Sequence, residues 1–166
     1  VRVYSEERDR PVLLLVDQRM SMFFGSRRTM KSVVAAEATA LAAWRVLHSG
    51  DRVGAIVFGD DEAAEIRPRR SEQNVMQILR KVVDLNHSLG VTEHKTARNR
   101  KAANAAKLNE TLQMANRLAT HDFLVCLITD GFGADDQSVR LVSSLCAHND
   151  VMTLFIYDPM EANLPD

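Results

Sequence analysis

Residues 11–22 read Pro-Val-Leu-Leu-Leu-Val-Asp-Gln-Arg-Met-Ser-Met, an uninterrupted apolar run that stops at Asp17. Residues 123–133, Phe-Leu-Val-Cys-Leu-Ile-Thr-Asp-Gly-Phe-Gly, have the same design and stop at Asp130. Apolar runs without alternation are typical of parallel strands covered on both faces. Such sheets bind ligands beyond the carboxyl ends of their strands, where the strand order reverses. If these two strands are neighbours, Asp17 and Asp130 face each other in one crevice.

The rest of the chain alternates between strand and helix patterns. Strands are predicted over residues 52–58, 63–67 and 151–157, and helices over 29–49, 71–84, 108–120 and 136–148. This alternation predicts an α/β fold, a three-layer doubly wound and mostly parallel sheet. Strand 63–67, which we expect Pro68 to end, is predicted to be an antiparallel edge strand. Residues 86–107 are predicted to be an irregular basic loop that grades into a helix.

Composition is that of an ordinary globular domain. The 166 residues are 46% hydrophobic and 26% charged, with a formal net charge of −1. This balance exerts no overall attraction toward nucleic acid or an anionic membrane. The chain begins with Val1 and a polar strip over residues 1–10, so we expect a piece of a longer protein whose domain covers residues 11–166. We expect the domain to be cytoplasmic, even if the parent protein is anchored in a membrane elsewhere.

Three segments carry a family resemblance when taken in order. Asp17-x-x-x-Ser21-Met follows an apolar strand, Gly-Asp-Arg-Val-Gly-Ala-Ile-Val-Phe follows over residues 50–58, and Leu-Ile-Thr-Asp-Gly ends the set. This order resembles a von Willebrand factor A domain. The 7–17 stretch and the closing Tyr-Asp-Pro-Met-Glu of residues 157–161 are more narrowly similar to a bacterial family, domain of unknown function 58. Its members are typically found alongside MoxR-type AAA+ ATPases.

The resemblance implies a Rossmann-like fold with a metal-ion-dependent adhesion site. In that site an Asp-x-Ser-x-Ser loop, a later threonine and a distal aspartate bind Mg²⁺, and a partner's carboxylate completes the shell. Asp17, Ser21 and Asp130 match the first aspartate, the second serine and the distal aspartate. Two positions depart from the pattern: Arg19 stands in place of the first serine, and Ala106 in place of the threonine. Thr92 or Thr96 substitutes for the threonine only if the basic loop folds back over the crevice.

Because Arg19 replaces the first serine of the family pattern, three interpretations of the site remain open. In the first, the guanidinium replaces the ion and forks between Asp17 and Asp130, so that no cofactor is needed. In the second, Arg19 swings outward and a weak Mg²⁺ site survives on Asp17, Ser21 and Asp130. In the third, both aspartates only cap loops and helix starts.

Four apolar side chains lie close together in the segment that follows Asp17. Met20, Met22, Phe23 and Phe24 are either an apolar rim that docks a partner or, as we favour, an anchor that packs beneath its own loop.

Glu37 falls at the centre of the apolar stripe of helix 29–49. We therefore expect it to be buried in an ion pair with an arginine, because an unpaired carboxylate there would be costly.

The predicted function is a non-enzymatic protein–protein interaction module with a degenerate adhesion site, working with a MoxR-type AAA+ ATPase. The binding residues would be Asp17, Arg19, Ser21 and Asp130, with the rim over residues 20–24. We expect no nucleic-acid partner, since the basic stretch lacks interleaved aromatic residues, and no membrane contact by this fragment. The alternatives are a metal-assisted phosphatase that uses Asp17 and Asp130, and a purely structural domain of a membrane-anchored protein.

Overall fold

The computed structural model describes residues 9–89 and 97–161, with the backbone alone for 97–103. The described elements are, in order, β1 (Val12–Asp17), a short 3₁₀ turn η1 (Met20–Met22), α1 (Lys31–His48), β2 (Val53–Phe58), β3 (Ala63–Arg69), α2 (Glu72–Ser88), α3 (Ala97–Leu118), β4 (Leu124–Thr129), α4 (Asp136–Cys146) and β5 (Asp150–Phe155).

The strands form one sheet in the order β3-β2-β1-β4-β5. Strand β1 is parallel to β2 and β4, β4 is parallel to β5, and β3 is antiparallel to β2 at the edge. The predicted fold class is therefore confirmed. The chain moves from β1 to one side of the sheet and later returns to the other side through β4. The order thus reverses between β1 and β4, and their carboxyl ends lie side by side.

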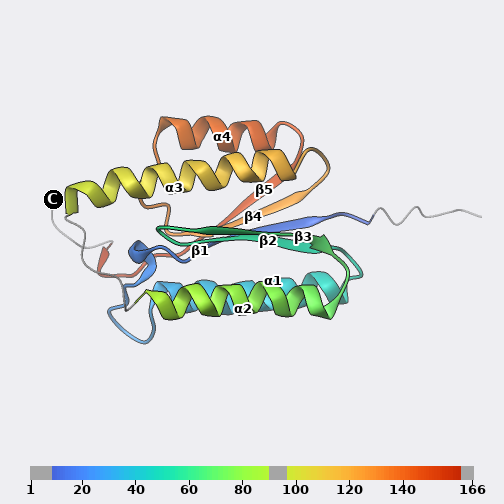
Figure 1. Ribbon diagram of the computed structural model, residues 1–166, viewed down its shortest axis with the longest axis horizontal. Helices are drawn as coiled ribbons and strands as arrows, with labels where there is room; N and C mark the ends of the chain where they lie inside the picture. The colour runs from blue at the N-terminus through green and yellow to red at the C-terminus, as the bar shows by residue number, and fades with distance from the viewer. Residues whose placement is uncertain (1–8, 90–96, 162–166) are drawn as a thin grey trace, which may run out of the picture.

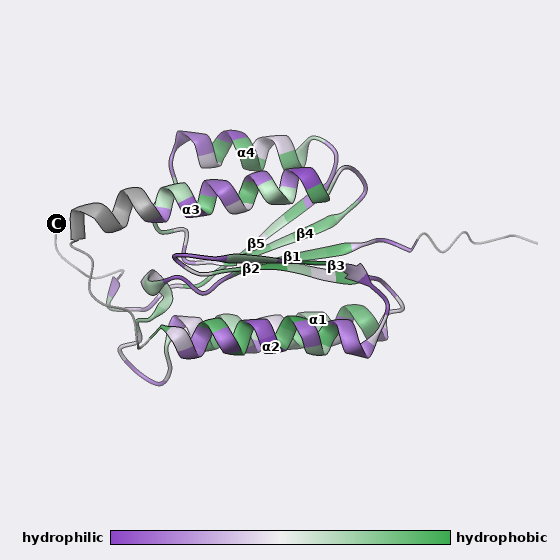
Figure 2. Cartoon of the chain, in the orientation of Figure 1, coloured by the Kyte–Doolittle hydropathy of each residue, from purple (hydrophilic) through white to green (hydrophobic). Residues whose placement is uncertain are grey.

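Helices cover the sheet on both faces, with α1 and α2 on one side and α3 and α4 on the other (Figure 1). Alternate residues of β1 serve the two layers: Leu14 and Val16 pack toward α1 and α2, whereas Leu13 and Leu15 pack toward α3 and α4. All four are at most 1% exposed. The three central strands β1, β2 and β4 are accordingly apolar along most of their length, while polar residues gather on the outer faces of the helices (Figure 2). Within the described residues, no helix combines the length and apolarity needed to cross a bilayer.

Local details differ from the sequence predictions at several places. Strand β3 continues through Pro68 to Arg69, because the pairing with β2 shifts register near there and an irregular edge tolerates proline. Helix α3 begins at Ala97, so much of the segment predicted to be irregular is helical. The Lys107 side chain is 8% exposed and pairs with Glu110 at 3.1 Å rather than facing solvent. Thr92 and Thr96 lie outside the described residues.

Much of the apolar stripe of helix α1 faces the sheet as predicted, since Ala43 is buried and Ala36, Trp44 and Leu47 pack against the core, but the assignment of Glu37 to this face is wrong. Glu37 is exposed, so the expected buried ion pair is wrong. The buried positions of α1 are small or polar instead: Lys31, Ser32, Ala35, Thr39 and Ala43. In a helix so rich in alanine the contrast between faces is weak, and small residues let the backbone approach the sheet closely. Packing therefore decided the orientation of this helix.

Candidate functional site

The innermost part of the carboxyl edge is an ion pair between Asp17, the last residue of β1, and Arg19. The Arg19 Nε donates to Asp17 Oδ1 at 3.0 Å, and Nη2 donates to Oδ2 at 2.6 Å. Both side chains are 0% exposed. The backbone N–H of Arg19 also donates to Asp17 Oδ1 at 3.0 Å, which turns the chain back over the strand end. The guanidinium is thus held by the carboxylate in a two-point, fork-like arrangement.

The remaining contacts of this pair come from other elements. Arg19 Nη1 donates to the backbone carbonyls of Asn104 at 2.7 Å and Phe132 at 3.1 Å. Its Cζ lies 5.4 Å from the centroid of the Phe58 ring. The Thr129 hydroxyl donates to Asp17 Oδ2 at 2.6 Å. Burial by itself would lower the pKa of Arg19, but the hydrogen bonds and charge of Asp17 outweigh it, and the pKa is raised.

A second cation sits on Asp130, just beyond β4. The closest approach of Arg19 Nη2 to Asp130 Oδ1 is 3.9 Å, so the guanidinium does not fork evenly between the two aspartates. Lys31 binds Asp130 instead, with 2.9 Å from Nζ to Oδ2, and also reaches Glu161 Oε1 at 2.6 Å. Burial by itself would lower the pKa of Lys31, but the hydrogen bonds to Glu161 and Asp130 outweigh it, and the pKa is raised.

Asp130 also receives neutral donors. The Ser21 hydroxyl lies 3.4 Å from Oδ1, and the backbone N–H of Phe132 donates to the same oxygen at 2.9 Å. Gly131, which lies between Asp130 and Phe132, has a φ of +66°, a left-handed conformation that glycine adopts readily, so the chain can turn back on Asp130. Gly133, with a φ of +80°, lets the same loop pass close to α3, since a Cβ there would meet the Ala105 nitrogen at 3.0 Å. The structure therefore brings Asp17, Arg19, Ser21 and Asp130 together at one edge.

Two further groups hold the loop after β1 in place. Gln18, which is 0% exposed, donates to the Ser32 carbonyl at 2.9 Å and accepts from Asn86 at 2.9 Å, tying the loop to α1 and α2. Asp158 accepts hydrogen bonds from the Ser26 hydroxyl and, at 2.8 Å, from the Ser26 N–H. These two bonds from Ser26 lower the pKa of Asp158. The closing Asp-Pro-Met-Glu stretch thus fastens the loop that enters α1.

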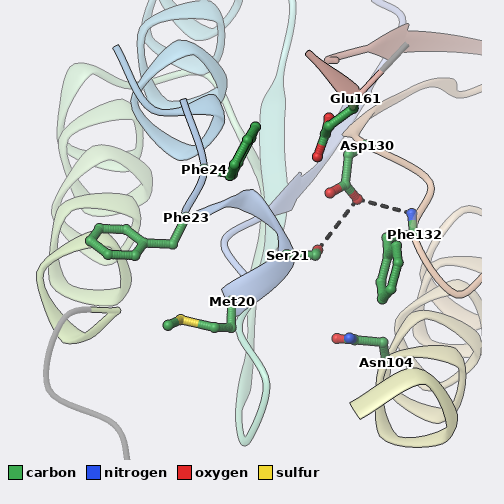
Figure 3. Close-up of a pocket in the computed structure, with 8 residues that line it drawn as sticks. All are labelled: Met20, Ser21, Phe23, Phe24, Asn104, Asp130, Phe132 and Glu161. Atoms are coloured by element: carbon green, nitrogen blue, oxygen red, sulfur yellow. Dashed lines mark hydrogen bonds between the residues drawn. The ribbon is translucent and has the colours of Figure 1, made fainter. Parts of the chain in front are cut away.

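Beside the ion pairs, the edge opens into a pocket of ≈ 410 Å³ (Figure 3). Its lining residues are Met20, Ser21, Phe23, Phe24, Asn104, Asp130, Phe132 and Glu161. Phe23 and Phe24 are each 39% exposed and Phe132 is 47% exposed. Met22 is 0% exposed and packs into the core. The favoured reading, in which the whole 20–24 segment anchors its own loop, therefore fails for Phe23 and Phe24.

The oxygens that a magnesium ion would need are largely engaged. Mg²⁺ prefers about six hard oxygen ligands in near-octahedral geometry. Arg19 occupies the side of Asp17 that faces Asp130, and Lys31 takes the second oxygen of Asp130. Among the residues that the structure describes, no three acidic, histidine or cysteine side chains are grouped to hold a metal. Ala106 is exposed on α3, and Asn104 is the α3 residue that contacts Arg19. This donor set does not fit Mg²⁺.

Four residues of this edge were not predicted from the sequence: Lys31, Asn104, Thr129 and Glu161. Thr129 and Glu161 stand inside the motifs that carried the resemblance, next to or near residues that were assigned. Lys31 offered a signal too, as a lone charge at the start of an alanine-rich helix. Asn104 offered none, because its place depends on where α3 begins.

Comparison with known proteins gives the chain a family. It matches, over residues 1–166, the family described as Protein of unknown function DUF58. The chain belongs to this family. No curated protein matches it in sequence.

Solved structures share its fold. BatB from Bacteroides thetaiotaomicron, described as a conserved hypothetical protein, is 19% identical with a TM-score of 0.57, over 88% of this chain and 66% of that chain. A von Willebrand factor type A protein from Catenulispora acidiphila is 19% identical with a TM-score of 0.53, over 87% and 32%. Manganese-loaded TRAP from Plasmodium vivax is 18% identical with a TM-score of 0.51, over 93% and 61%. This DUF58 chain therefore has a von Willebrand factor A-like fold and spans less than two thirds of the length of each of these chains.

Proposed function

We propose that this DUF58 domain is a protein-interaction module that binds its partner at the carboxyl edge of the sheet. The adhesion site there is degenerate, with Arg19 and Lys31 in place of the metal ion. The partner is a MoxR-type AAA+ ATPase, as the family resemblance implies. The observation that carries the proposal is a sealed, internally neutralised Asp17–Arg19 pair directly beneath an open pocket.

The rim of the pocket supports a docking role. Exposed aromatic residues on both sides of one opening are costly to leave in water unless they meet a partner. Phe23 and Phe24 come from the loop after β1, and Phe132 from the loop after β4. The loop after β1 is fastened by Gln18 and Asp158, and the loop after β4 by the hydrogen bond from Arg19 to the Phe132 carbonyl. The rim is therefore presented in a fixed arrangement, which lowers the entropy cost of binding.

The built-in cations support the loss of the ion. Manganese is bound in TRAP, a protein of similar fold. In this chain Arg19 already neutralises Asp17, and Lys31 neutralises Asp130. The same contacts argue against a phosphatase that uses Asp17 and Asp130. Asp17 is sealed from solvent by a two-point arginine contact and by Thr129, which leaves it no access to a substrate.

Binding to the ATPase tests the proposal. A purified MoxR-type ATPase from the same organism is titrated onto immobilised wild type and onto the Phe24→Ser and Phe132→Ser variants. We expect each substitution to weaken binding by about tenfold or more, as at an interface hot spot. Leu41→Ser is the matched control, because Leu41 is 75% exposed on α1 and lies outside the pocket. Equal binding by all four proteins, or by none, overturns the proposal and favours a purely structural domain.

Calorimetric titration with Mg²⁺ and Mn²⁺ tests the loss of the ion. We expect no binding heat from wild type at millimolar concentrations. Arg19→Ser, which restores the serine of the family pattern and frees Asp17, is expected to gain thermal stability when Mn²⁺ is added. Saturable Mn²⁺ binding by wild type that is lost in Asp130→Asn would overturn this part of the proposal.

A further inference from the structure

The pocket at the carboxyl edge contains an acceptor that nothing in the described chain satisfies. Asn104 is 4% exposed and lines the pocket, and its Oδ1 is buried without a hydrogen-bond partner among the described residues. In Figure 3 its side chain points into the opening, below Phe132 and across from Ser21 and Met20. A buried oxygen without a donor costs free energy, so this position is suited to a ligand that donates.

We propose that the pocket binds a basic side chain, lysine or arginine, presented by a protein partner. The inference rests on the proposed function and names the chemistry of its ligand. It reverses the preference that the family resemblance implies, since an adhesion site that holds a metal ion takes a partner's carboxylate.

The other polar groups of the pocket also accept hydrogen bonds. Glu161 Oε1 and Oε2 accept from Lys31 and from the Asp158 N–H, and each oxygen keeps a second lone pair. Asp130 Oδ2 accepts from Lys31 and likewise keeps a second lone pair, whereas Oδ1 accepts from both the Phe132 N–H and the Ser21 hydroxyl. The Ser21 hydroxyl is turned toward Asp130, so its proton is not offered to a ligand. Lysine and arginine side chains bring only donors, which matches this set.

The charges of the site point the same way. Arg19 is balanced by Asp17, whereas Lys31 faces two carboxylates, Asp130 and Glu161, which leaves one negative charge in excess. That excess is accessible to a ligand, because the Glu161 side chain is 36% exposed. A carboxylate ligand would be repelled here, and a cation would be attracted.

The walls of the pocket suit a cation with an apolar stem. Phe132 and Phe24 lie on opposite sides of the opening in Figure 3, and both line the pocket. Aromatic ring faces attract lysine and arginine heads and pack against their methylene groups. The volume of ≈ 410 Å³ lies in the range of ordinary ligand sites.

Small capped amino acids serve as probes of this inference. The ¹⁵N-labelled domain is titrated with N-acetyl-arginine amide and N-acetyl-lysine amide, and in parallel with N-acetyl-glutamate amide and N-acetyl-glutamine amide. We expect saturable shifts of the Asn104 side-chain amide and of the Phe132 and Ser21 backbone amides with the basic probes, with dissociation constants on the order of 1–10 mM. The acidic and neutral probes are expected to leave these signals unchanged.

Three variants separate the parts of the pocket. Asn104→Leu removes the acceptor, Glu161→Gln removes the excess charge, and Phe132→Leu removes an exposed ring with little effect on folding. We expect each to weaken binding of the basic probes about threefold or more. Glu72→Gln is the control for Glu161→Gln, because Glu72 is exposed at the start of α2 and its loss changes net charge by the same amount.

The outcomes divide clearly. Absence of saturable shifts with the basic probes, or an equal response to the acidic probe, overturns the inference. An effect of Glu72→Gln as large as that of Glu161→Gln overturns it as well, because attraction would then be unspecific. If the ATPase binds through the rim while the basic probes do not shift the pocket, the inference fails and the proposed function stands. If the probes bind and the ATPase does not, the partner is wrong and the inference stands.

Discussion

Two groups of ion-paired side chains lie at different depths of the carboxyl edge of the sheet. The inner pair, Asp17 with Arg19, is 0% exposed, and it is also bound by the backbone carbonyls of Asn104 and Phe132 and by the Thr129 hydroxyl. The outer triad, Lys31 with Asp130 and Glu161, borders the pocket, and the Glu161 side chain is 36% exposed. The inner pair has the properties of a structural element. The outer triad has the charge imbalance and the access to solvent that recognition requires.

Under the proposed function, the family pattern is divided between two tasks, neutralising the aspartates and contacting the partner. In a metal-bound adhesion site, as the resemblance implies it, a single ion both neutralises the aspartates and meets the partner. In this chain Arg19 neutralises Asp17 but cannot meet a partner, because it is sealed beneath Phe132 and Asn104. In the proposed function, contact with a partner is left to the pocket and its rim.

The largest expected effect comes from breaking the inner pair. Arg19→Met leaves the Asp17 carboxylate buried without its counter-charge, and we expect the free energy of unfolding to fall by about 3–5 kcal/mol. Urea denaturation followed by circular dichroism measures it.

The double variant Asp17→Leu, Arg19→Met is the control for this substitution. Since removal of both partners leaves no orphaned charge, it is expected to recover more than half of the loss. If Arg19→Met unfolds at the wild-type urea concentration, the inner pair has no structural role and the comparison fails.

A smaller loss is expected from the outer triad. Lys31→Met removes hydrogen bonds to two carboxylates, but Glu161 can turn to water, and we expect a loss of about 1.5–3 kcal/mol in the same denaturation experiment. The basic probes should bind this variant more tightly than wild type, because its pocket carries more negative charge. A loss as large as that of Arg19→Met would mean that the outer triad stabilises the fold as much as the inner pair does.

The Thr129 hydroxyl tests how far the inner pair depends on neutral support. Its hydrogen bond to Asp17 is 2.6 Å long and fully buried. Thr129→Val keeps the shape of the side chain, and we expect a loss of about 1 kcal/mol, typical of one hydrogen bond. Thr153→Val, on the exposed strand β5, is the matched control and should cost less. Equal losses would mean that Asp17 does not need the hydroxyl.

The smallest effect is a pH dependence from the loop that enters α1. Because folding lowers the pKa of Asp158, its charge stabilises the protein above the unfolded pKa of about 3.9 and ceases to do so as the pH falls through the folded pKa. Asp158→Asn should therefore be less stable than wild type at neutral pH, and the difference should shrink below about pH 4. Denaturation at both pH values measures it, and a constant difference would contradict the prediction.

The two aspartates at the carboxyl edge were predictable, because the end of a buried strand can be recognised from a short stretch of sequence. Each of β1 and β4 is an apolar run followed by an aspartate, and parallel neighbours bring their carboxyl ends to one edge. The meeting of Asp17 and Asp130 follows from that rule. The partition of charges did not follow. In one of the three interpretations Arg19 forks between both aspartates, whereas it binds Asp17 at 2.6 Å, approaches Asp130 only to 3.9 Å, and shares Asp130 with Lys31.

The reasons for the failures are physical. Lys31 and Glu161 are far apart in sequence and meet only because α1 begins beside the end of the chain that follows β5. Glu37 was assigned to the wrong face since an alanine-rich helix has little hydrophobic contrast to orient it. Met22 and its neighbours Phe23 and Phe24 are chemically alike, and only the turn at η1 buries the first and exposes the others.

Sequence patterns were sufficient to predict the order of strands and helices, the doubly wound, mostly parallel sheet and the position of two aspartates at its carboxyl edge. These depend on hydrophobic periodicity and on the ends of apolar runs, which are local properties. Only the packing of the folded chain fixes which cation neutralises which aspartate, which aromatic residues face solvent, and that Asn104 lines a pocket with an oxygen that no described residue pairs with. Those depend on distances between segments remote in sequence, which only the packing of the helices against the sheet determines.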